Sequence, residues 1–386
     1  MPEKQIFQTT KKSRWITFQW ITRLLIIVFI IATACVAYTL LSNHYPTLPQ
    51  ISSSSTLTKK QLEQIKKSTT FKEFNISKKK LLKIRNDQKM HHLKNPNNKV
   101  RINAGFYVAW DPQSLDDLKD HIKQLDMVVT ESYFIKNGAD TLIDQVDPDA
   151  MKVIRKNKKT AIAMVSNYSK DHFDGNAIHK LLQDKDLQNR FISNLIISLK
   201  KYGYNGVNID FEEIVEKSDA PLAAFQKNLY EKLHAQNLLV TQDISPDNDD
   251  YNLPVLDKYN DYIFIMAYDQ HSDSSNAGDI SNQQWVEVQL DRICEKISSD
   301  KVMLALACYG YDWPEGDVGK DITYQQAIAT ASRYKGKIQY NEVSANLSFS
   351  YQDESNLKHE VYFTDAATNF NLIRKADDWG VVWRPE

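Results

Sequence analysis

Three polar residues alternate with apolar ones near the middle of the chain, and their spacing could support acid–base chemistry. If this stretch is a β-strand, Asn208, Asp210 and Glu212 share one face, because successive side chains point to opposite faces. Two carboxyl groups in one confined space push their proton affinities apart, which leaves one protonated acid and one anion at neutral pH. The stretch therefore has the composition of a general-acid site.

The elements around this stretch indicate how it is positioned. The same alternation would also suit a water-facing strand of an antiparallel sheet. However, the residues from Lys200 to Gly203 have the composition of a helix end with glycine as terminator, and a second helical pattern follows soon after Glu213. A helix on each side of the strand indicates a parallel sheet with covered faces, so the polar residues need a cavity, water or each other.

The stretch resembles the signature of family 18 glycoside hydrolases, Asp-x-x-Asp-x-Asp-x-Glu. Asn205 and Asn208 stand at the first two Asp positions, whereas Asp210 and Glu212 match the last two positions. The family carries this signature on the fourth strand of a TIM barrel. Asn at the middle position occurs in its spore-cortex-lytic branch, which acts on peptidoglycan. The resemblance implies that Asp210 and Glu212 carry the chemistry, and that Asn208 cannot take up a proton as Asp would.

Two further segments are similar to motifs of the family. Met266, Tyr268 and Asp269 match its sixth-strand Met-x-Tyr-Asp motif. Trp383 stands where the eighth strand of the family supplies a tryptophan beneath the sugar. Both matches imply a sugar site at one end of a barrel.

The resemblance covers about residues 101–384, with one clear departure. The third-strand Ser-x-Gly-Gly motif of chitinases is absent, since Ala163 to Tyr168 has a different sequence. Substrate preference therefore cannot be transferred from chitinases. The region is most similar to family 18 domains that bacteria fuse to a polysaccharide deacetylase and a membrane glycosyltransferase.

The resemblance implies substrate-assisted, retaining hydrolysis of a polymer of N-acetylhexosamine. Glu212 would protonate the glycosidic oxygen while the acetamido carbonyl of the substrate attacks the anomeric carbon. Asp210, held by Asn208, would stabilise the acetamido nitrogen, and Tyr268 would donate a hydrogen bond to the acetamido oxygen. Further substrate contacts are expected from polar and aromatic side chains: Asn208, Met266, Asp269, Asp243, Tyr107, Trp110, Trp313 and Trp383.

No metal or cofactor is expected from the sequence. His271 lies close to Tyr268 in the chain, but no second His stands at ligand spacing. A deacetylase would need a metal triad of Asp and His, which the sequence does not offer. The rival function is a non-catalytic glycan-binding barrel in the cell envelope, which Asn205 and Asn208 would favour.

Strand and helix patterns alternate through residues 101–386, which are expected to form the hydrolase-like domain. Such units suit a (β/α)8 barrel or an open doubly wound sheet. We predict an α/β fold of the (β/α)8 TIM barrel type, because the acidic motif lies at the carboxyl end of a strand and no Gly-rich phosphate loop follows the first strand. A small α+β insertion is expected at about 317–363, between strands 7 and 8. The last strand is short, which indicates either a minimal eighth strand or a shortened reading frame.

The segments before the domain suggest attachment to a membrane. Residues 1–14 are expected to be a cytoplasmic N-terminus and 15–41 a transmembrane signal-anchor, because Leu24 to Leu41 carries no charge. The alternative for 15–41 is a cleaved signal peptide. Residues 42–100 are predicted to be a basic polar linker. The positive flank would stay in the cytoplasm, leaving the catalytic domain extracytoplasmic, either periplasmic or at the cell surface.

Composition sets the remaining limits. With 386 residues and 42% hydrophobic residues, the chain can bury one large core with appendages. A formal net charge of -1 indicates no nucleic acid or other polyanion as partner. The three Cys are too few for a disulfide framework. The oligomeric state is left open.

Overall fold

The computed structural model divides into two compact units, Met1–Pro49 and Gln50–Glu386. It describes residues 12–41, 52–53, 102–136, 141–169, 172–214 and 220–381. The expected cytoplasmic segment 1–14 and linker 42–100 therefore lie largely outside the described residues.

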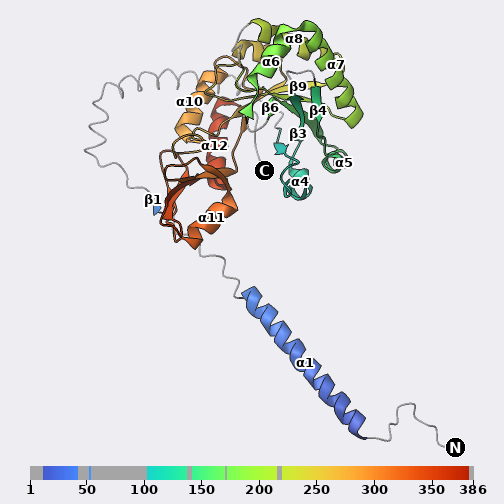
Figure 1. Ribbon diagram of the computed structural model, residues 1–386, viewed down its shortest axis with the longest axis vertical. Helices are drawn as coiled ribbons and strands as arrows, with labels where there is room; N and C mark the ends of the chain where they lie inside the picture. The colour runs from blue at the N-terminus through green and yellow to red at the C-terminus, as the bar shows by residue number, and fades with distance from the viewer. Residues whose placement is uncertain are drawn as a thin grey trace, which may run out of the picture. The chain divides into compact units, whose positions relative to one another are not determined.

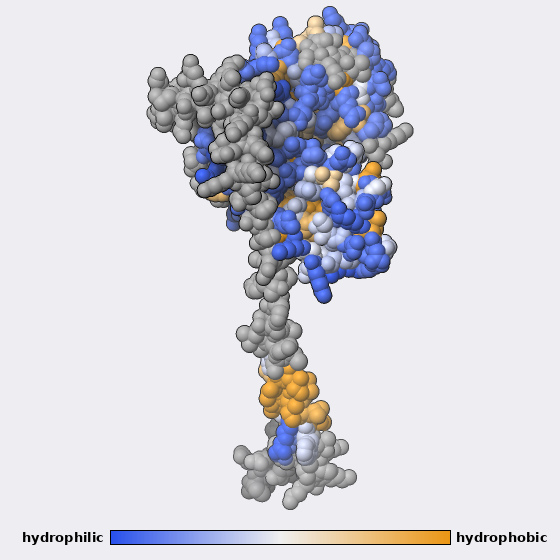
Figure 2. All heavy atoms as spheres, turned by 90° about the vertical axis from the view of Figure 1, so that its left-hand side faces the viewer, coloured by the Kyte–Doolittle hydropathy of each residue, from blue (hydrophilic) through white to orange (hydrophobic). Residues whose placement is uncertain are grey.

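The first unit contains one helix, α1 (Lys12–Leu41), among its described residues. Its side chains from 18 to 33 are exposed, and Figure 2 shows most of them as an orange, apolar band with hydrophilic atoms at one end. A bilayer span needs about 20 apolar residues in sequence. Among the described residues no helix is long and apolar enough for this, so the predicted transmembrane segment at 15–41 is not supported.

The second unit is built on an eight-stranded sheet with the order β11-β10-β9-β8-β5-β3-β2, in which β4 pairs with β3. All neighbours on this path pair in parallel, and β4 is antiparallel. The strands are β2 (Ala104–Tyr107), β3 (Met127–Lys136), β4 (Thr141–Asp144), β5 (Thr160–Ser166), β8 (Gly206–Asp210), β9 (Leu239–Ile244), β10 (Tyr262–Met266) and β11 (Val302–Ala305).

Side chains from both ends of this sheet meet on its inner face. Phe106 on β2 and Phe264 on β10 lie edge to face, with ring centroids 5.3 Å apart. One buried cluster joins strands from across the sheet: Ile102, Met127, Val129, Ile162, Phe264 and Met303. The sheet is therefore curled, as the barrel prediction requires. Most of the expected eighth strand, including Trp383, falls on residues outside the described part of the chain.

Helices cover the outer face of the curled sheet. They are α4 (Ser114–His121), η2 (Ile122–Gln124), α5 (Pro148–Lys156), α6 (Gly175–Gln183), α7 (Lys185–Tyr202), α8 (Ala220–His234), α9 (Leu253–Lys258), α10 (Gln283–Cys294) and α12 (Ala366–Trp379). Figure 1 shows α7 and α8 side by side, and their apolar stripes pack in one core with the outward residues of the strands. Gly203 ends α7 in the left-handed conformation, with φ of 75°, which confirms the predicted terminator.

The segment between β11 and α12 forms a second sheet that is antiparallel from β14 to β13. It contains β12 (Tyr309–Pro314), β13 (Lys320–Thr323), α11 (Tyr324–Arg333), β14 (Gln339–Tyr340), β15 (Leu347–Gln352) and β16 (Lys358–Phe363). It has its own apolar core around Phe349, Val361 and Phe363. From the segment expected to be a linker, β1 (Ser52–Ser53) pairs in parallel with β14. Figure 1 shows this layer beside α12.

Candidate active site

The side chains of strand β8 alternate between two faces, as the sequence pattern predicts. Val207 and Ile209 pack in the core that the outer helices share. Asn208 is fully buried, and its register partner on β9 is Thr241. Asp210 is the next residue on the Asn208 face, at the carboxyl end of the strand. Parallel barrels present their reactive side chains at this end.

Asn208 is held by hydrogen bonds on both sides of its amide. Its Oδ1 accepts from the Thr241 hydroxyl at 2.6 Å, and its Nδ2 donates to Asp243 Oδ2 at 2.6 Å. The amide therefore links β8 to two residues of β9. Each end of the amide therefore has its own hydrogen-bond partner.

The backbone of Glu212 is clamped just after β8. Asn167, which is fully buried, accepts from the Glu212 amide at 3.0 Å and donates to the Glu212 carbonyl at 2.9 Å. The following residue, Glu213, has φ of 53°, so the chain turns sharply there. Gly175 at the start of α6 touches this turn, since a Cβ on it would lie 2.0 Å from the Glu213 carbonyl oxygen. These contacts hold Glu212 at the end of the strand.

The carboxyl ends of the strands enclose a cavity of about 350 Å³. Five of its lining residues carry carboxyl groups, and none of the described residues that line it is a Lys or Arg. The lining residues are Phe106, Tyr107, Val108, Glu131, Met164, Phe173, Asp210, Glu212, Asp243, Met266, Tyr268 and Asp269. We refer to this cavity as the acidic cleft.

Burial and crowding separate the two carboxyl groups of the sequence motif. Burial raises the pKa of Glu212 from its ordinary 4.5 to about 8, and the nearby charge of Asp210 adds to the rise. Burial also raises the pKa of Asp210, to about 6, although a hydrogen bond from Ser166 opposes the shift. At pH 7 Glu212 is therefore mostly protonated, whereas Asp210 is mostly ionised. This is the division that a general acid and an anionic stabiliser require.

Asp243 and Tyr268 complete the polar side of the acidic cleft. Burial, followed by the charge of Asp210, raises the pKa of Asp243 well above its usual value. Burial and then the charge of Asp243 likewise raise the pKa of Tyr268, so its hydroxyl stays a neutral hydrogen-bond donor. Asp269 accepts from the hydroxyls of Tyr309 at 2.6 Å and Tyr311 at 3.1 Å, which ties the cleft to the second sheet.

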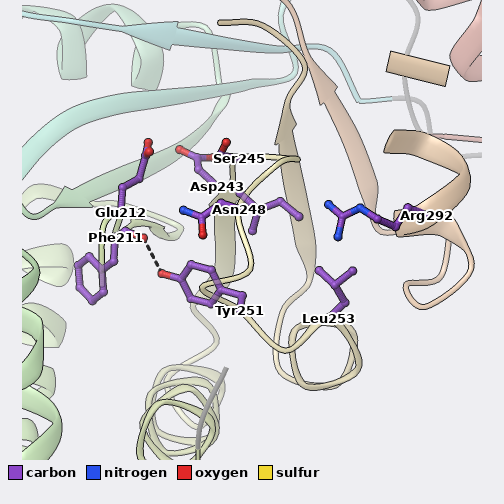
Figure 3. A pocket seen from close by; sticks show the side chains of 9 residues that line it. Phe211, Glu212, Asp243, Ser245, Asn248, Tyr251, Leu253 and Arg292 are labelled. Atoms are coloured by element: carbon purple, nitrogen blue, oxygen red, sulfur yellow. Dashed lines mark hydrogen bonds between the residues drawn. The ribbon is translucent and has the colours of Figure 1, made fainter. Parts of the chain in front are cut away.

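A small cavity of about 10 Å³ adjoins the acidic cleft through residues that line both. Figure 3 shows Glu212 and Asp243 with their carboxyl groups at the same end of it. The Tyr251 hydroxyl donates to the Phe211 carbonyl at 2.9 Å and so braces the residue before Glu212. Arg292 lines the cavity but donates to the Pro246 carbonyl and, at 3.2 Å, to Gln289 Oε1.

The structure places most of the predicted site residues together. Seven of them line the acidic cleft: Tyr107, Asp210, Glu212, Asp243, Met266, Tyr268 and Asp269. Asp243 was expected as a polar contact at the mouth, yet it is only 3% exposed and is bonded to Asn208. Asn208 was expected to hold Asp210, but its amide donates to Asp243 instead, and it lies buried beside the cleft without lining it.

The predicted aromatic contacts lie in different positions relative to the cleft. Trp110 is 75% exposed and donates to Glu131 Oε2 at 2.8 Å, so it lies beside a cleft residue. The Tyr107 hydroxyl is turned away toward Asp147, the N-cap of α5. Trp313 is buried and donates to the Ser272 carbonyl, outside the cleft. Trp383 lies outside the described residues.

Sequence reasoning missed several residues of the site. The two that matter most are Glu131, which lines the cleft, and Asn167, which holds the Glu212 backbone. Glu131 is the one acidic residue within β3, and its acidic type in an otherwise uncharged stretch from Met127 to Phe134 was the available signal. Asn167 follows β5 directly, where the missing Ser-x-Gly-Gly motif would stand. The described residues contain no group of three or more His, Cys, Asp or Glu arranged to hold a metal ion.

A curled parallel sheet with one protonated and one ionised carboxyl group at its strand ends is the arrangement of a barrel-type glycosidase. The chain belongs to family 18 of the glycosyl hydrolases, whose sequence pattern matches residues 102–383.

Three known proteins show the extent of the similarity. "Uncharacterized glycosylase YvbX" of Bacillus subtilis (strain 168) is 27% identical over 276 residues, which cover 68% of this chain and 80% of the relative. The crystal structure of the Bacillus cereus spore cortex-lytic enzyme SleL matches with a TM-score of 0.68 at 20% identity, covering 73% of this chain and 69% of that chain. The crystal structure of a chitinase from Chromobacterium violaceum matches with a TM-score of 0.68 at 22% identity. The match covers 74% of this chain and 92% of the chitinase chain. The two structures share the fold.

Proposed function

We propose that this family 18 hydrolase cleaves β-1,4-linked N-acetylhexosamine polymers, either chitin-like or the glycan of peptidoglycan, by substrate-assisted retaining hydrolysis. The observation that carries the proposal is the pair of Glu212, with its pKa at about 8, and Asp210, with its pKa at about 6, in one cleft. The named relatives include a cortex-lytic enzyme and a chitinase, which supports both polymer classes.

The roles follow from the protonation states. Glu212 gives its proton to the glycosidic oxygen as the bond to the anomeric carbon breaks. The acetamido oxygen of the substrate forms the new bond to that carbon, so no carboxylate nucleophile is needed. Asp210, as an anion, stabilises the acetamido nitrogen while positive charge develops, and the neutral Tyr268 hydroxyl donates to the acetamido oxygen. Water then opens the intermediate and returns a proton to Glu212.

The lining of the cleft suits an uncharged acetamido sugar. Phe106, Met164 and Met266 offer apolar contact beside the carboxyl groups. Five carboxyl groups without a basic residue among the described lining residues would repel an anionic ligand. This favours a neutral N-acetylhexosamine at the reacting position.

The test compares turnover with binding. The full chain is incubated with a chromogenic N-acetylglucosamine oligomer and with purified peptidoglycan, and the anomer of the product is read by NMR immediately after cleavage. We expect release of product with retained configuration, and no release by Glu212→Gln. Binding of the oligomer without turnover by the unmodified chain would instead support the non-catalytic glycan-binding barrel.

We further propose that the domain works outside the cytoplasm, at the cell envelope, because polymers of this kind lie there. The test is protease treatment of intact cells that express the full chain. Digestion of the domain in intact cells would support this location. Protection until the cells are lysed would contradict it.

A further inference from the structure

The carboxyl groups of Asp210 and Asp243 are neighbours across two parallel strands. The register pairs Asn208 with Thr241 and Ile209 with Gln242, so the next residues along, Asp210 and Asp243, lie side by side. Adjacent strands are about 4.8 Å apart, and residues in register share a face. The two carboxyl groups therefore face the same cleft from neighbouring strands.

The two oxygens of Asp243 have different surroundings. Asp243 Oδ2 accepts from Asn208 Nδ2 at 2.6 Å, whereas Oδ1 is buried and has no hydrogen-bond partner among the described residues. Because Oδ2 already accepts from Asn208, a proton on this carboxyl group belongs on Oδ1. A buried carboxylate is destabilised when one of its oxygens accepts no hydrogen bond, and a proton on that oxygen removes the destabilisation.

The ionisable groups that face Asp243 from the surrounding elements are mainly carboxyl groups and phenols. Asp210 and Glu212 face it from β8 and the turn after it, and Tyr268 and Asp269 face the same cleft from the end of β10. From α10, Arg292 reaches the adjoining small cavity, where it is bonded to Pro246 and Gln289. Tyr251 lines that cavity as a neutral phenol, since burial raises its pKa well above the usual value.

We propose that Asp243 is a positioning residue that stays protonated and donates a hydrogen bond from Oδ1 to Asp210, with Asn208 fixing its orientation. The bond holds the Asp210 carboxylate ionised and aimed at the substrate. No proton is transferred, so Asp243 keeps its proton through the reaction. The inference rests on the proposed function for its catalytic meaning, but the protonation of Asp243 can be measured without substrate.

The first experiment is a titration of the full chain labelled with carbon-13 at the Asp side-chain carboxyls, followed by NMR. We expect the Asp243 signal to show the protonated form at pH 7, and the Asp210 signal to show two steps. The titration uses a Glu212→Gln background, because Glu212, with its pKa at about 8, would add a step of its own to the Asp210 signal. The lower step, at about 6, then reports Asp210 itself, and the higher one reports loss of the Asp243 proton. An ionised Asp243 at pH 7 would overturn the proposal.

Three variants separate a proton-holding role from a structural one. In Asp243→Asn, made in the same Glu212→Gln background as the other two variants, the upper step at Asp210 should vanish. In the exchange Asn208→Asp with Asp243→Asn, one carboxyl group and one amide still face each other, and the two steps should return. Thr241→Val is the matched control, because it removes a bond to Asn208 without changing the number of carboxyl groups, and both steps should persist. Persistence of two steps in Asp243→Asn would refute the assignment.

Kinetics with Glu212 intact then test the catalytic meaning. We expect Asp243→Ala to lower kcat by about 100-fold with KM little changed, because a displaced stabilising group costs about that much. Asp243→Asn should retain most of kcat, because its amide can accept from Asn208 and donate to Asp210 as the protonated carboxyl group does. An unchanged kcat in Asp243→Ala would overturn the positioning role. If the unmodified chain shows no turnover, the proposed function fails, while the titration still decides the protonation of Asp243.

Discussion

Replacement of Glu212 by Gln should make the protein more stable near neutral pH while it abolishes hydrolysis. The folded state holds the Glu212 proton up to about pH 8, whereas the unfolded chain releases it near 4.5. Between these values the unfolded state binds fewer protons, so stability falls as pH rises. Below 4.5 both states are protonated and no penalty remains. Gln cannot ionise and therefore avoids the penalty across the whole window.

The size of the effect follows from the shift. Each pH unit inside the window costs the folded state about 1.4 kcal/mol, so about 3 kcal/mol has accumulated by pH 7. The assay is urea unfolding of both proteins at pH 4 and at pH 7, followed by circular dichroism. The difference in unfolding free energy between Glu212→Gln and the unmodified chain should grow by about 3 kcal/mol from pH 4 to pH 7. Comparing two pH values cancels any change in packing caused by the amide itself.

A matched control lies next to the site. Glu213 is exposed, so Glu213→Gln should give nearly the same stability difference at both pH values. If Glu212→Gln behaves like this control, the carboxyl group is not held protonated by burial. The reasoning for Glu212 as the general acid would then be refuted, whatever the activity of the variant.

Three further predictions concern the reaction and its supports. Hydrolysis should follow a bell-shaped pH profile that falls below about 6, as Asp210 takes up a proton, and above about 8, as Glu212 loses one; a flat profile from pH 5 to 9 would contradict both roles. Asn167→Ala should remove both bonds to the Glu212 backbone, lower kcat by about 10-fold or more, and cost about 1–3 kcal/mol of stability in thermal unfolding. The Trp110 ring is exposed, so Trp110→Ala should raise KM for longer oligomers several-fold without changing the melting temperature. A drop in melting temperature would show a structural role instead.

Local pattern predicted the elements that carry the site. The period of two in β8 correctly separated the core residues Val207 and Ile209 from Asn208, because a strand must alternate its side chains. The helix stripe of Leu222, Phe225, Leu229 and Leu233 is buried as the spacing predicts. Such features depend on a few neighbouring residues, so the sequence is sufficient to find them.

The cleft itself contains residues that no local pattern joins. Glu131 lies within β3 and lines the cleft, whereas Asn167 follows β5 and holds the Glu212 backbone. Both reach the site because β5 pairs with β8 and β3 pairs with β5. Apart from its acidic type, Glu131 has no feature that distinguishes it within its strand. Their part in the site depends on contacts between distant segments, which periodicity does not encode.

Asp243 shows most clearly where local reasoning ends. From the sequence, the chain has an acid at the end of an apolar stretch, and the family resemblance makes Glu212 and Asp210 the reactive pair. The pairing of Asp243 with Asn208, 35 residues away, depends on the register between β8 and β9. A slip of one residue would turn Asp243 to the opposite face of the sheet. Residue types and spacing therefore establish which acid chemistry is available, whereas strand register and burial establish which carboxyl groups hold protons.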